Sequence, residues 1–162
     1  MDKSNFDVVV IGAGPAGYVC AIRCAQLGLN VACVDAWSDK NNKPSPGGTC
    51  LNVGCIPSKA LLDSSHHYSF LANHAADHGI TTQQCEIDVA KMLQRKNKVV
   101  KTLTTGVKGL LKNNKVTFVH GNAVIKMGKE VHVSTHEGDQ VLVAESIVIA
   151  TGSKPFELDF LP

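Results

Sequence analysis

The 162-residue sequence has no strong charge of either sign, no long apolar run and no internal repeat. Its formal net charge is +2, with acidic and basic residues interspersed, so nothing points to nucleic acid or to an anionic membrane surface. The first residues, Met1 to Asn5, lack the apolar core of a secretory signal and the arginines of a transit peptide. No run approaches the length of a membrane helix. These absences predict one globular domain, long enough for a real core, in the cytoplasm.

Six cysteines could indicate a disulfide-stapled domain. Because the chain has a normal apolar content and no secretory signal, a reducing compartment with one special cysteine pair fits better. Cys20 and Cys24 have a spacing that metal ligands can have, but no third ligand follows, which favours packing of a helix on a sheet. His74 and His78 lack an accompanying carboxylate or cysteine pattern, so we predict exposed histidines and no metal site.

A glycine motif follows a predicted buried strand near the start of the chain. Phe6 to Ile11 is short, apolar and β-branched, as buried strands are. In a dinucleotide-binding turn the first glycine makes the bend, the second admits the pyrophosphate and the third lets helix and strand pack closely. The motif here is a G-x-G-x-x-G, formed by Gly12, Ala13, Gly14, Pro15, Ala16 and Gly17.

The segments after the glycines complete a β–α–β unit. A helix is predicted over Tyr18 to Leu27, ended by Gly28, and a second strand over Asn30 to Val34. The strand leads to Asp35, which can accept hydrogen bonds from an adenosine ribose, while the helix N-terminus favours the pyrophosphate charge. The simpler alternative is a glycine-rich turn without a ligand, and the motif alone does not choose between NAD and FAD.

Cys50 and Cys55 stand five residues apart, directly behind a glycine pair and ahead of an apolar helical run. Thiolates attack disulfides only when their pKa is lowered, which a helix N-terminus or a cation can do. Pro57 suits a first helical position, and Lys59 lies one turn beyond Cys55. Five residues of straight helix rise about 7.5 Å, so a disulfide between the two requires an irregular turn, which Gly54 favours. A redox-active dithiol needs a nearby electron acceptor, and this favours FAD over NAD.

The remaining segments predict two further helices and several strands. A loop over 36–48 is expected to be solvated surface, and helices are predicted within 49–72 and over about 87–112. The strands predicted after Lys115 form a small β-meander and then a closing strand that breaks at Thr151-Gly152. The predicted fold class is α/β, a Rossmann-like FAD-binding domain with a parallel sheet plus a small antiparallel β-meander. The expected strands are 116–120, 130–134, 140–143 and 146–150.

The run GGTCLNVGCIPSKALL resembles the redox-disulfide segment of the flavin disulfide reductases, and its ending, Ser58 to Leu62, is most similar to the dihydrolipoamide dehydrogenases among them. Ala150-Thr151-Gly152 resembles the segment that closes the FAD domain in that family, and Gly121-Asn122-Ala123 corresponds to a strand end near the adenine. The resemblance and the glycine motif together give these cofactor-binding candidates: Gly12, Gly14, Pro15, Ala16, Gly17, Asp35, Gly48, Thr49, Cys50, Lys59, Gly121, Ala123, Ala150, Thr151 and Gly152.

The resemblance also implies catalytic roles and partners. It makes Cys50 the thiol that exchanges with a dithiol substrate, Cys55 the thiolate beside the flavin, and Lys59 a cation that favours the thiolate. NAD⁺ would be the co-substrate. Lipoyl domains of 2-oxo acid dehydrogenase complexes or of the glycine cleavage system would be the partners, and the full-length protein would be a homodimer.

Length sets the chain apart from the family, whose members are about three times longer. We expect residues 1–155 to be an incomplete FAD-binding domain and 156–162 to begin the linker to an NAD-binding domain that is absent here. A later Gly-Asp segment and a C-terminal His-Glu motif are also absent, so the chain alone should not turn over. Two alternatives stay open: a mercuric, glutathione or transhydrogenase-type reductase, and a self-contained nucleotide-binding module whose cysteines act as a passive sensor.

Overall fold

The computed structural model describes residues 3–81 and 83–153, and within them six strands form one sheet in the order β3-β2-β1-β6-β5-β4. β1 (Lys3–Ile11) lies between β2 (Val31–Asp35) and β6 (Gly138–Ile149), and β3 (Thr117–His120) lies at the edge beside β2. These four strands run parallel, as expected for strands joined by long crossover connections. The α/β fold class predicted from the sequence is confirmed.

The register of the parallel strands brings their carboxyl ends to one edge of the sheet. Ile11 lies opposite both Val34 and Ile149, and Asp35 lies opposite His120. The chain winds from β1 toward β2 and β3, then returns to the other side of β1 through β6. In open α/β sheets, ligands bind outside the carboxyl ends of the strands where the winding direction reverses, which here is the edge beyond β1 and β6.

The antiparallel part of the sheet differs from the prediction in three respects. The predicted strand 116–120 is β3, a parallel member of the main sheet, because its apolar residues pair with those of buried β2 rather than with a sequence neighbour. A strand missed from the sequence, β4 (Asn122–Lys126), pairs with β5 (Glu130–Thr135). The strands predicted at 140–143 and 146–150 are one continuous strand, β6, which pairs with β5 and β1.

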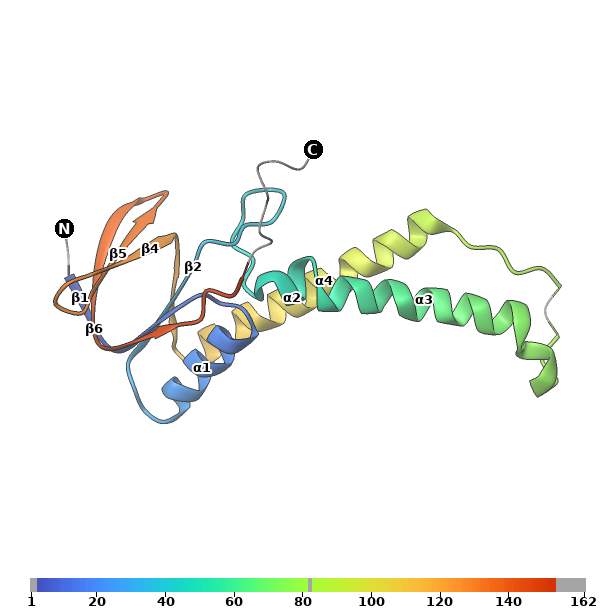
Figure 1. Ribbon diagram of the computed structural model, residues 1–162, viewed down its shortest axis with the longest axis horizontal. Helices are drawn as coiled ribbons and strands as arrows, with labels where there is room; N and C mark the ends of the chain where they lie inside the picture. The colour runs from blue at the N-terminus through green and yellow to red at the C-terminus, as the bar shows by residue number, and fades with distance from the viewer. Residues whose placement is uncertain (1–2, 82, 154–162) are drawn as a thin grey trace, which may run out of the picture.

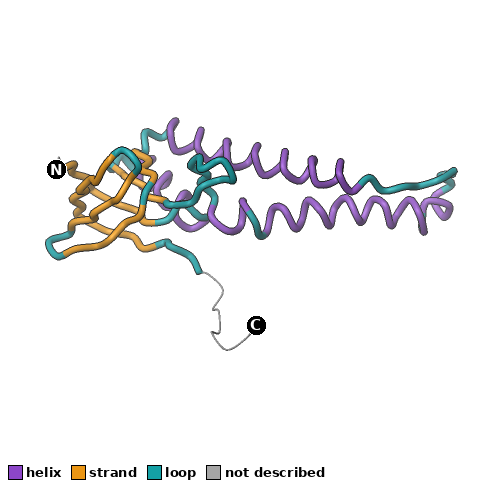
Figure 2. Tube along the Cα trace, turned by 90° about the horizontal axis from the view of Figure 1, so that it is seen from above, coloured by secondary structure: helices purple, strands orange, loops and turns teal. Residues whose placement is uncertain are grey.

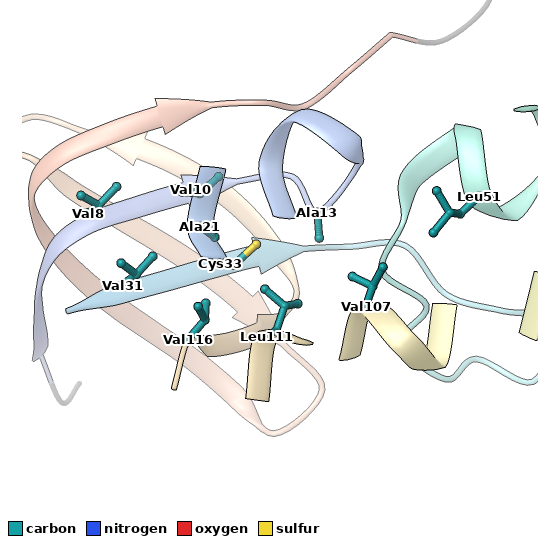
Figure 3. Close-up of a cluster of buried hydrophobic side chains, with 10 residues drawn as sticks. All are labelled: Val8, Val10, Ala13, Ala21, Val31, Cys33, Leu51, Val107, Leu111 and Val116. Carbon is teal, nitrogen blue, oxygen red and sulfur yellow. The ribbon is translucent and has the colours of Figure 1, made fainter. Parts of the chain in front are cut away.

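The two faces of the sheet have separate hydrophobic cores. Val8 and Val10 of β1 point to one core, where α1 (Pro15–Gln26) and the end of α4 (Val89–Asn113) cover the sheet (Figure 3). The alternate residues of β1, Val9 and Ile11, lie in the second core, together with residues of β5 such as Val131 and Val133. Burial on both faces is the reason that β1 reads as a continuous apolar run rather than an alternating pattern.

The remaining helices form a long hairpin. α2 (Gly48–Asn52) leads into α3 (Cys55–Asn73), then a short 3₁₀ helix, η1 (Ala75–His78), and the antiparallel α4. Both views show α3 and the first half of α4 projecting away from the sheet (Figures 1 and 2). The predicted helix over 87–112 is confirmed within two residues, and the Asp88 side chain caps it by accepting a 3.0 Å hydrogen bond from the Lys91 amide. Among the described residues, no helix combines the length and apolarity needed to cross a membrane.

Candidate functional site

The glycine motif forms the tight turn between β1 and α1. The helix begins at Pro15, three residues earlier than predicted, because proline is well suited to a first helical position. Gly12 has a φ of 103°, and a side chain there would collide with the Ala150 carbonyl oxygen. A Cβ at Gly17 would likewise collide with the Gly12 carbonyl oxygen, whereas one at Gly14 would find only the Gly48 Cα, at 3.8 Å. Gly12 and Gly17 are therefore needed by the fold itself, while Gly14 leaves an open cradle at the helix N-terminus.

Asp35 lies at the end of β2 with one carboxylate oxygen satisfied and one not. Its Oδ1 accepts a hydrogen bond from the Ala13 amide at 3.2 Å, and the nearby Trp37 amide also favours the charged carboxylate. Oδ2 is buried and has no hydrogen-bond partner among the described residues. Burial raises the pKa of Asp35, although these amides and the charge of His120 act in the opposite direction. A buried acceptor without a donor fits a ribose hydroxyl, which would supply one.

A cavity of about 210 Å³ surrounds this carboxylate at the carboxyl edge of the sheet. Gly12 lines it from the turn after β1, Asp35 from β2, Gly121 and Ala123 from the β3–β4 connection and the start of β4, and Thr151 from the segment after β6. The Ala150 amide donates a 2.8 Å hydrogen bond to the Ile11 carbonyl, which holds that last segment against the glycine turn. The cavity with its unpaired Asp35 oxygen fits the adenosine of FAD, and the open side of Gly14 at the helix N-terminus fits the pyrophosphate.

A second cavity of about 200 Å³, next to the first, is lined by side chains that the sequence analysis missed. Ser38 Oγ and His120 Nε2 are hydrogen-bonded at 3.1 Å, and the His136 ring lies 6.2 Å from that of His120. The two cavities share Ala36, Gly121 and Asn122. No motif marks these residues, because Ser38 and His120 are brought together only by the pairing of β2 with β3.

The cysteine pair lies across a break between two helices. Cys50 is in α2, and Cys55 is the first residue of α3. At the break the amides of Val53 and Gly54 both donate to the Thr49 carbonyl, at 3.0 and 2.7 Å, so the chain does not continue as a regular helix. The irregular turn that a Cys50–Cys55 disulfide requires is therefore present.

Pro57 is the third residue of α3, not the first as predicted. The helix already begins at Cys55, directly after the turn at Gly54, and Ser58 donates to the Gly54 carbonyl at 3.1 Å. Proline is tolerated at this position because the first amides of a helix have no intrahelical partner.

Both thiols of the pair are free in this structure, with Cys55 exposed and Cys50 half-buried. The hydrogen bond with the Cys55 side chain, burial, and the neighbouring Cys55 charge together raise the pKa of Cys50, while the Cys55 amide and the Lys59 cation lower it. Lys59 thus lowers the pKa of Cys50, as predicted, but in the dithiol form Cys55 raises that pKa by more than Lys59 lowers it. The order of roles assigned to the two sulfurs stays a prediction.

One hydrogen bond joins the cysteine segment to the glycine turn, and three more hold the end of the preceding loop to α2. The Gly47 amide donates to the Ala13 carbonyl at 2.7 Å, and the Asn52 side chain donates to the carbonyls of Ser45 and Gly48 at 3.0 and 2.9 Å. Ser45 returns a 2.8 Å hydrogen bond to the Asn52 carbonyl oxygen. The loop over 36–48 is therefore fixed at its end rather than simply solvated. Asn52, which the sequence analysis did not single out, positions Cys50 through this contact.

The other predicted residues lie away from this site. His74 and His78 are exposed, and Cys20 and Cys24 pack half-buried against the core on the helix side of the sheet. Within residues 3–81 and 83–153, no group of three or more His, Cys, Asp or Glu side chains is arranged to hold a metal. Thr49 and Lys59, both cofactor candidates, are exposed on the cysteine segment.

Comparison with known proteins agrees with this geometry. A family described as Pyridine nucleotide-disulphide oxidoreductase matches residues 6–162. A dihydrolipoyl dehydrogenase of Cupriavidus necator is 49% identical over 156 residues, which cover 94% of this chain and 32% of that protein. A mitochondrial dihydrolipoyl dehydrogenase of Pisum sativum is 49% identical, with 91% and 28% covered.

A solved structure of the HOCl-induced flavoprotein disulfide reductase RclA from Escherichia coli, a Cu(II) complex, has the same fold with a TM-score of 0.76. It is 27% identical, and the match covers 98% of this chain and 31% of that one. The chain thus spans about a third of the length of the relatives it matches.

Proposed function

The chain belongs to the pyridine nucleotide-disulphide oxidoreductase family, and from this we propose that it is the FAD-binding, dithiol-bearing part of a dihydrolipoyl dehydrogenase. The whole enzyme would oxidise protein-bound dihydrolipoamide and reduce NAD⁺. The names of the similar proteins support this choice within the family. The family and the flavoprotein among the solved structures indicate FAD as the cofactor of this domain.

One observation carries the proposal: the glycine turn and the cysteine helix touch. A Cβ at Gly48 would lie only 2.8 Å from the Gly14 Cα, so position 48 leaves no room for a side chain against the glycine turn. Gly48 begins α2, the helix that carries Cys50. A turn suited to a pyrophosphate and a dithiol are therefore in contact, although 35 residues separate Cys50 from Pro15 in the sequence. A nucleotide-binding module with unrelated cysteines needs no such contact.

The residues that would hold FAD follow from the cavity and the helix terminus. The Asp35 carboxylate would accept from the adenosine ribose, and Gly121 and Ala123 would form the adenine wall of the cavity. The N-terminus of α1, left open by Gly14, favours the pyrophosphate charge. When bound, FAD supplies the two-electron acceptor that a dithiol needs. Gly48, Thr49, Lys59 and the segment Ala150–Gly152 complete the proposed set of contacts.

The dithiol chemistry uses this chain's own sulfurs. With Cys50 and Cys55 joined as a disulfide, a thiolate of dihydrolipoamide attacks the Cys50 sulfur, forms a mixed disulfide and releases Cys55 as a thiolate. The second substrate thiol then displaces Cys50, so the substrate leaves as a disulfide and its two electrons stay on the cysteine pair. The Lys59 cation and the Cys55 amide, both of which lower the pKa of Cys50, stabilise the thiolate form.

The remaining features of the whole enzyme are part of the proposal. NAD⁺ would be the co-substrate, lipoyl domains of 2-oxo acid dehydrogenase complexes or of the glycine cleavage system the partners, and a homodimer the assembly. We assign residues 1–155 to the FAD domain, and the proposed linker at 156–162 lies outside the described residues. For the localisation we propose a reducing compartment, the cytoplasm, which fits the six free thiols of this structure. The similar protein of pea is named as mitochondrial.

The proposal is tested by counting thiols and following FAD in the same samples. Thiols are counted after unfolding, because Cys33 is buried in the folded chain. The reduced chain has six cysteines, and mild oxidation should leave four free thiols, while Cys50→Ser or Cys55→Ser should show five before and after. Cys85→Ser is the matched control, because it should still lose two thiols on oxidation. Wild-type chain should also co-elute with FAD from gel filtration. If the wild type binds FAD but forms no disulfide, the chain is a nucleotide-binding module and the dithiol proposal is wrong. If it forms the disulfide but does not bind FAD, the cofactor assignment is wrong.

A further inference from the structure

A larger cavity, of about 500 Å³, lies away from the proposed FAD site. It is formed where the end of α4 meets the beginning of β3, and none of its lining residues lines the adenosine cavity. Leu111 and Val116 form part of its wall and belong to the core on the helix side of the sheet, where Figure 3 shows them. Phe118 adds the face of a half-buried aromatic ring. The volume is within the range of small-molecule sites.

The loop over 36–48 closes one side of this cavity through Pro44. Ser38 and Pro44 form a β-bridge, and the Asp39 carboxylate accepts hydrogen bonds from the amides of Asn41 and Lys43 at 2.8 and 3.0 Å. This part of the loop is therefore a closed turn with its own hydrogen bonds. It supplies a defined apolar wall opposite the helix.

Three cations line the same cavity: Lys108, Lys112 and Lys115. Within the described part of the chain none of them forms a salt bridge. Asp39 lies near Lys108, and its pKa is lowered chiefly by the amides of Lys43 and Asn41 and only secondarily by the charges of Lys108 and Lys43. The lysines therefore keep an excess of positive charge beside an apolar wall.

We propose that this cavity binds a small amphipathic anion, with an aromatic or aliphatic body against Leu111, Val116 and Phe118 and one carboxylate, sulfonate or phosphate beside the lysines. Apolar contact supplies the affinity, and the lysines select an anionic head over a neutral one. The site does not depend on the proposed function, since it shares no residue with the FAD or dithiol site.

The test uses anilinonaphthalene sulfonate, a fluorescent aromatic anion of this class, on the full chain. Lys108→Glu/Lys112→Glu should weaken its binding by about tenfold or more, because two attractive charges become repulsive. Lys98→Glu/Lys101→Glu makes the same charge change on exposed residues of α4 outside the cavity and should change binding less than about twofold. Equal losses in the two variants would show general attraction to a basic surface and overturn the proposal.

Two further ligands, an uncharged probe and ADP, distinguish this site from the alternatives. Uncharged N-phenyl-1-naphthylamine should bind about tenfold more weakly than the sulfonate, and equal affinity would mean an apolar patch without anion selection. ADP should not displace the probe, because the adenosine cavity is separate. Displacement by ADP would place the probe in the nucleotide site and overturn the inference, while leaving the proposed function intact.

Discussion

Gly14 and Gly17 are three residues apart, yet an added methyl group meets different surroundings at each. At Gly17 it collides with backbone, and at Gly14 it meets only the Gly48 Cα at ordinary contact distance. The sequence motif treats both as equivalent glycines. The structure separates a residue that the fold requires from one that only a ligand requires.

This separation predicts opposite effects of two alanine substitutions. Gly17→Ala should lower the free energy of unfolding by about 1–3 kcal/mol or more, because backbone has to move. Gly14→Ala should leave stability nearly unchanged but weaken FAD binding at least tenfold, since the methyl group occupies the open cradle. Urea unfolding and FAD titration of the same variants measure both quantities. A Gly14→Ala chain that binds FAD as wild type does would contradict the pyrophosphate assignment.

Asp35 predicts a pH dependence of stability in the cofactor-free chain. Burial raises the pKa of its carboxyl above the unfolded value of about 3.9, so the folded chain holds this proton more tightly than the unfolded one. Ionisation of Asp35 therefore lowers the free energy of unfolding as the pH rises from about 4 through the raised pKa. Asp35→Asn should gain stability relative to wild type across that window, measured by urea unfolding at several pH values.

The same substitution should act against the ligand. Removing the charged acceptor should weaken FAD or ADP about tenfold to a hundredfold, the usual worth of a hydrogen bond to a charged group. Asp39→Asn, at an exposed turn, is the control for the loss of a carboxylate on the same loop. An Asp35→Asn chain with unchanged affinity and an unchanged pH profile would remove Asp35 from the site.

The α3–α4 hairpin is the element with the least support from the core. Between residues 61 and 103, Ala75 is the only side chain among those described that is buried. Arg95 joins the two helices near their base, donating to the Ala60 carbonyl at 2.9 Å and to Asp63 at 2.6 Å. Ala60 follows Lys59 on α3, so this contact also fixes the helix that begins at Cys55.

We expect the amides of the outer hairpin to exchange with solvent faster than those of β1 and β2, because few buried contacts resist local opening. Arg95→Ala should increase that exchange further, because the free energy of local opening falls by about 1 kcal/mol at this half-exposed site. Lys91→Ala removes an exposed ion pair on the same helix, 3.4 Å from Asp88, and should change little. Hydrogen exchange by mass spectrometry resolves both segments. Unchanged protection in Arg95→Ala would show that helix contacts alone hold the hairpin.

At the scale of the whole molecule, the adenosine site is assembled from four segments of one sheet edge. β1, β2, the β3–β4 connection and the residues after β6 each contribute to the cavity. A ligand there binds only the folded chain, so it should stabilise the entire sheet. The proposed flavin end, by contrast, includes the exposed residues Thr49, Cys55 and Lys59 of the cysteine segment.

This arrangement predicts the ligand preference of the chain. FAD and ADP should both raise the thermal midpoint, by an amount equivalent to about 2.7 kcal/mol at a hundredfold excess over the dissociation constant. FMN, which lacks the adenosine, should give no shift at the same concentration. Differential scanning calorimetry with the three ligands measures this. A shift with FMN but not with ADP would reverse the proposed orientation of the cofactor.

The sequence by itself determined the local parts: β1 and its glycine turn, the acid at the end of β2, and the irregular turn between the two cysteines. These depend on residues close in the chain, since turn geometry, helix caps and apolar runs are short-range properties. For the same reason the boundaries of α4 were predicted within two residues. Pro57 was misplaced because the turn at Gly54, three residues upstream of it, had already begun the helix.

Only the tertiary structure decided which segments meet. The pairing of β3 with β2, the pairing of β6 with β1 and the closeness of Gly14 to Gly48 all join residues distant in sequence. Such contacts depend on complementary burial and on closing long loops, which no local pattern specifies. The glycine and cysteine motifs can each be recognised in the sequence. Their contact, which supports a dithiol linked to a flavin, exists only in the folded chain.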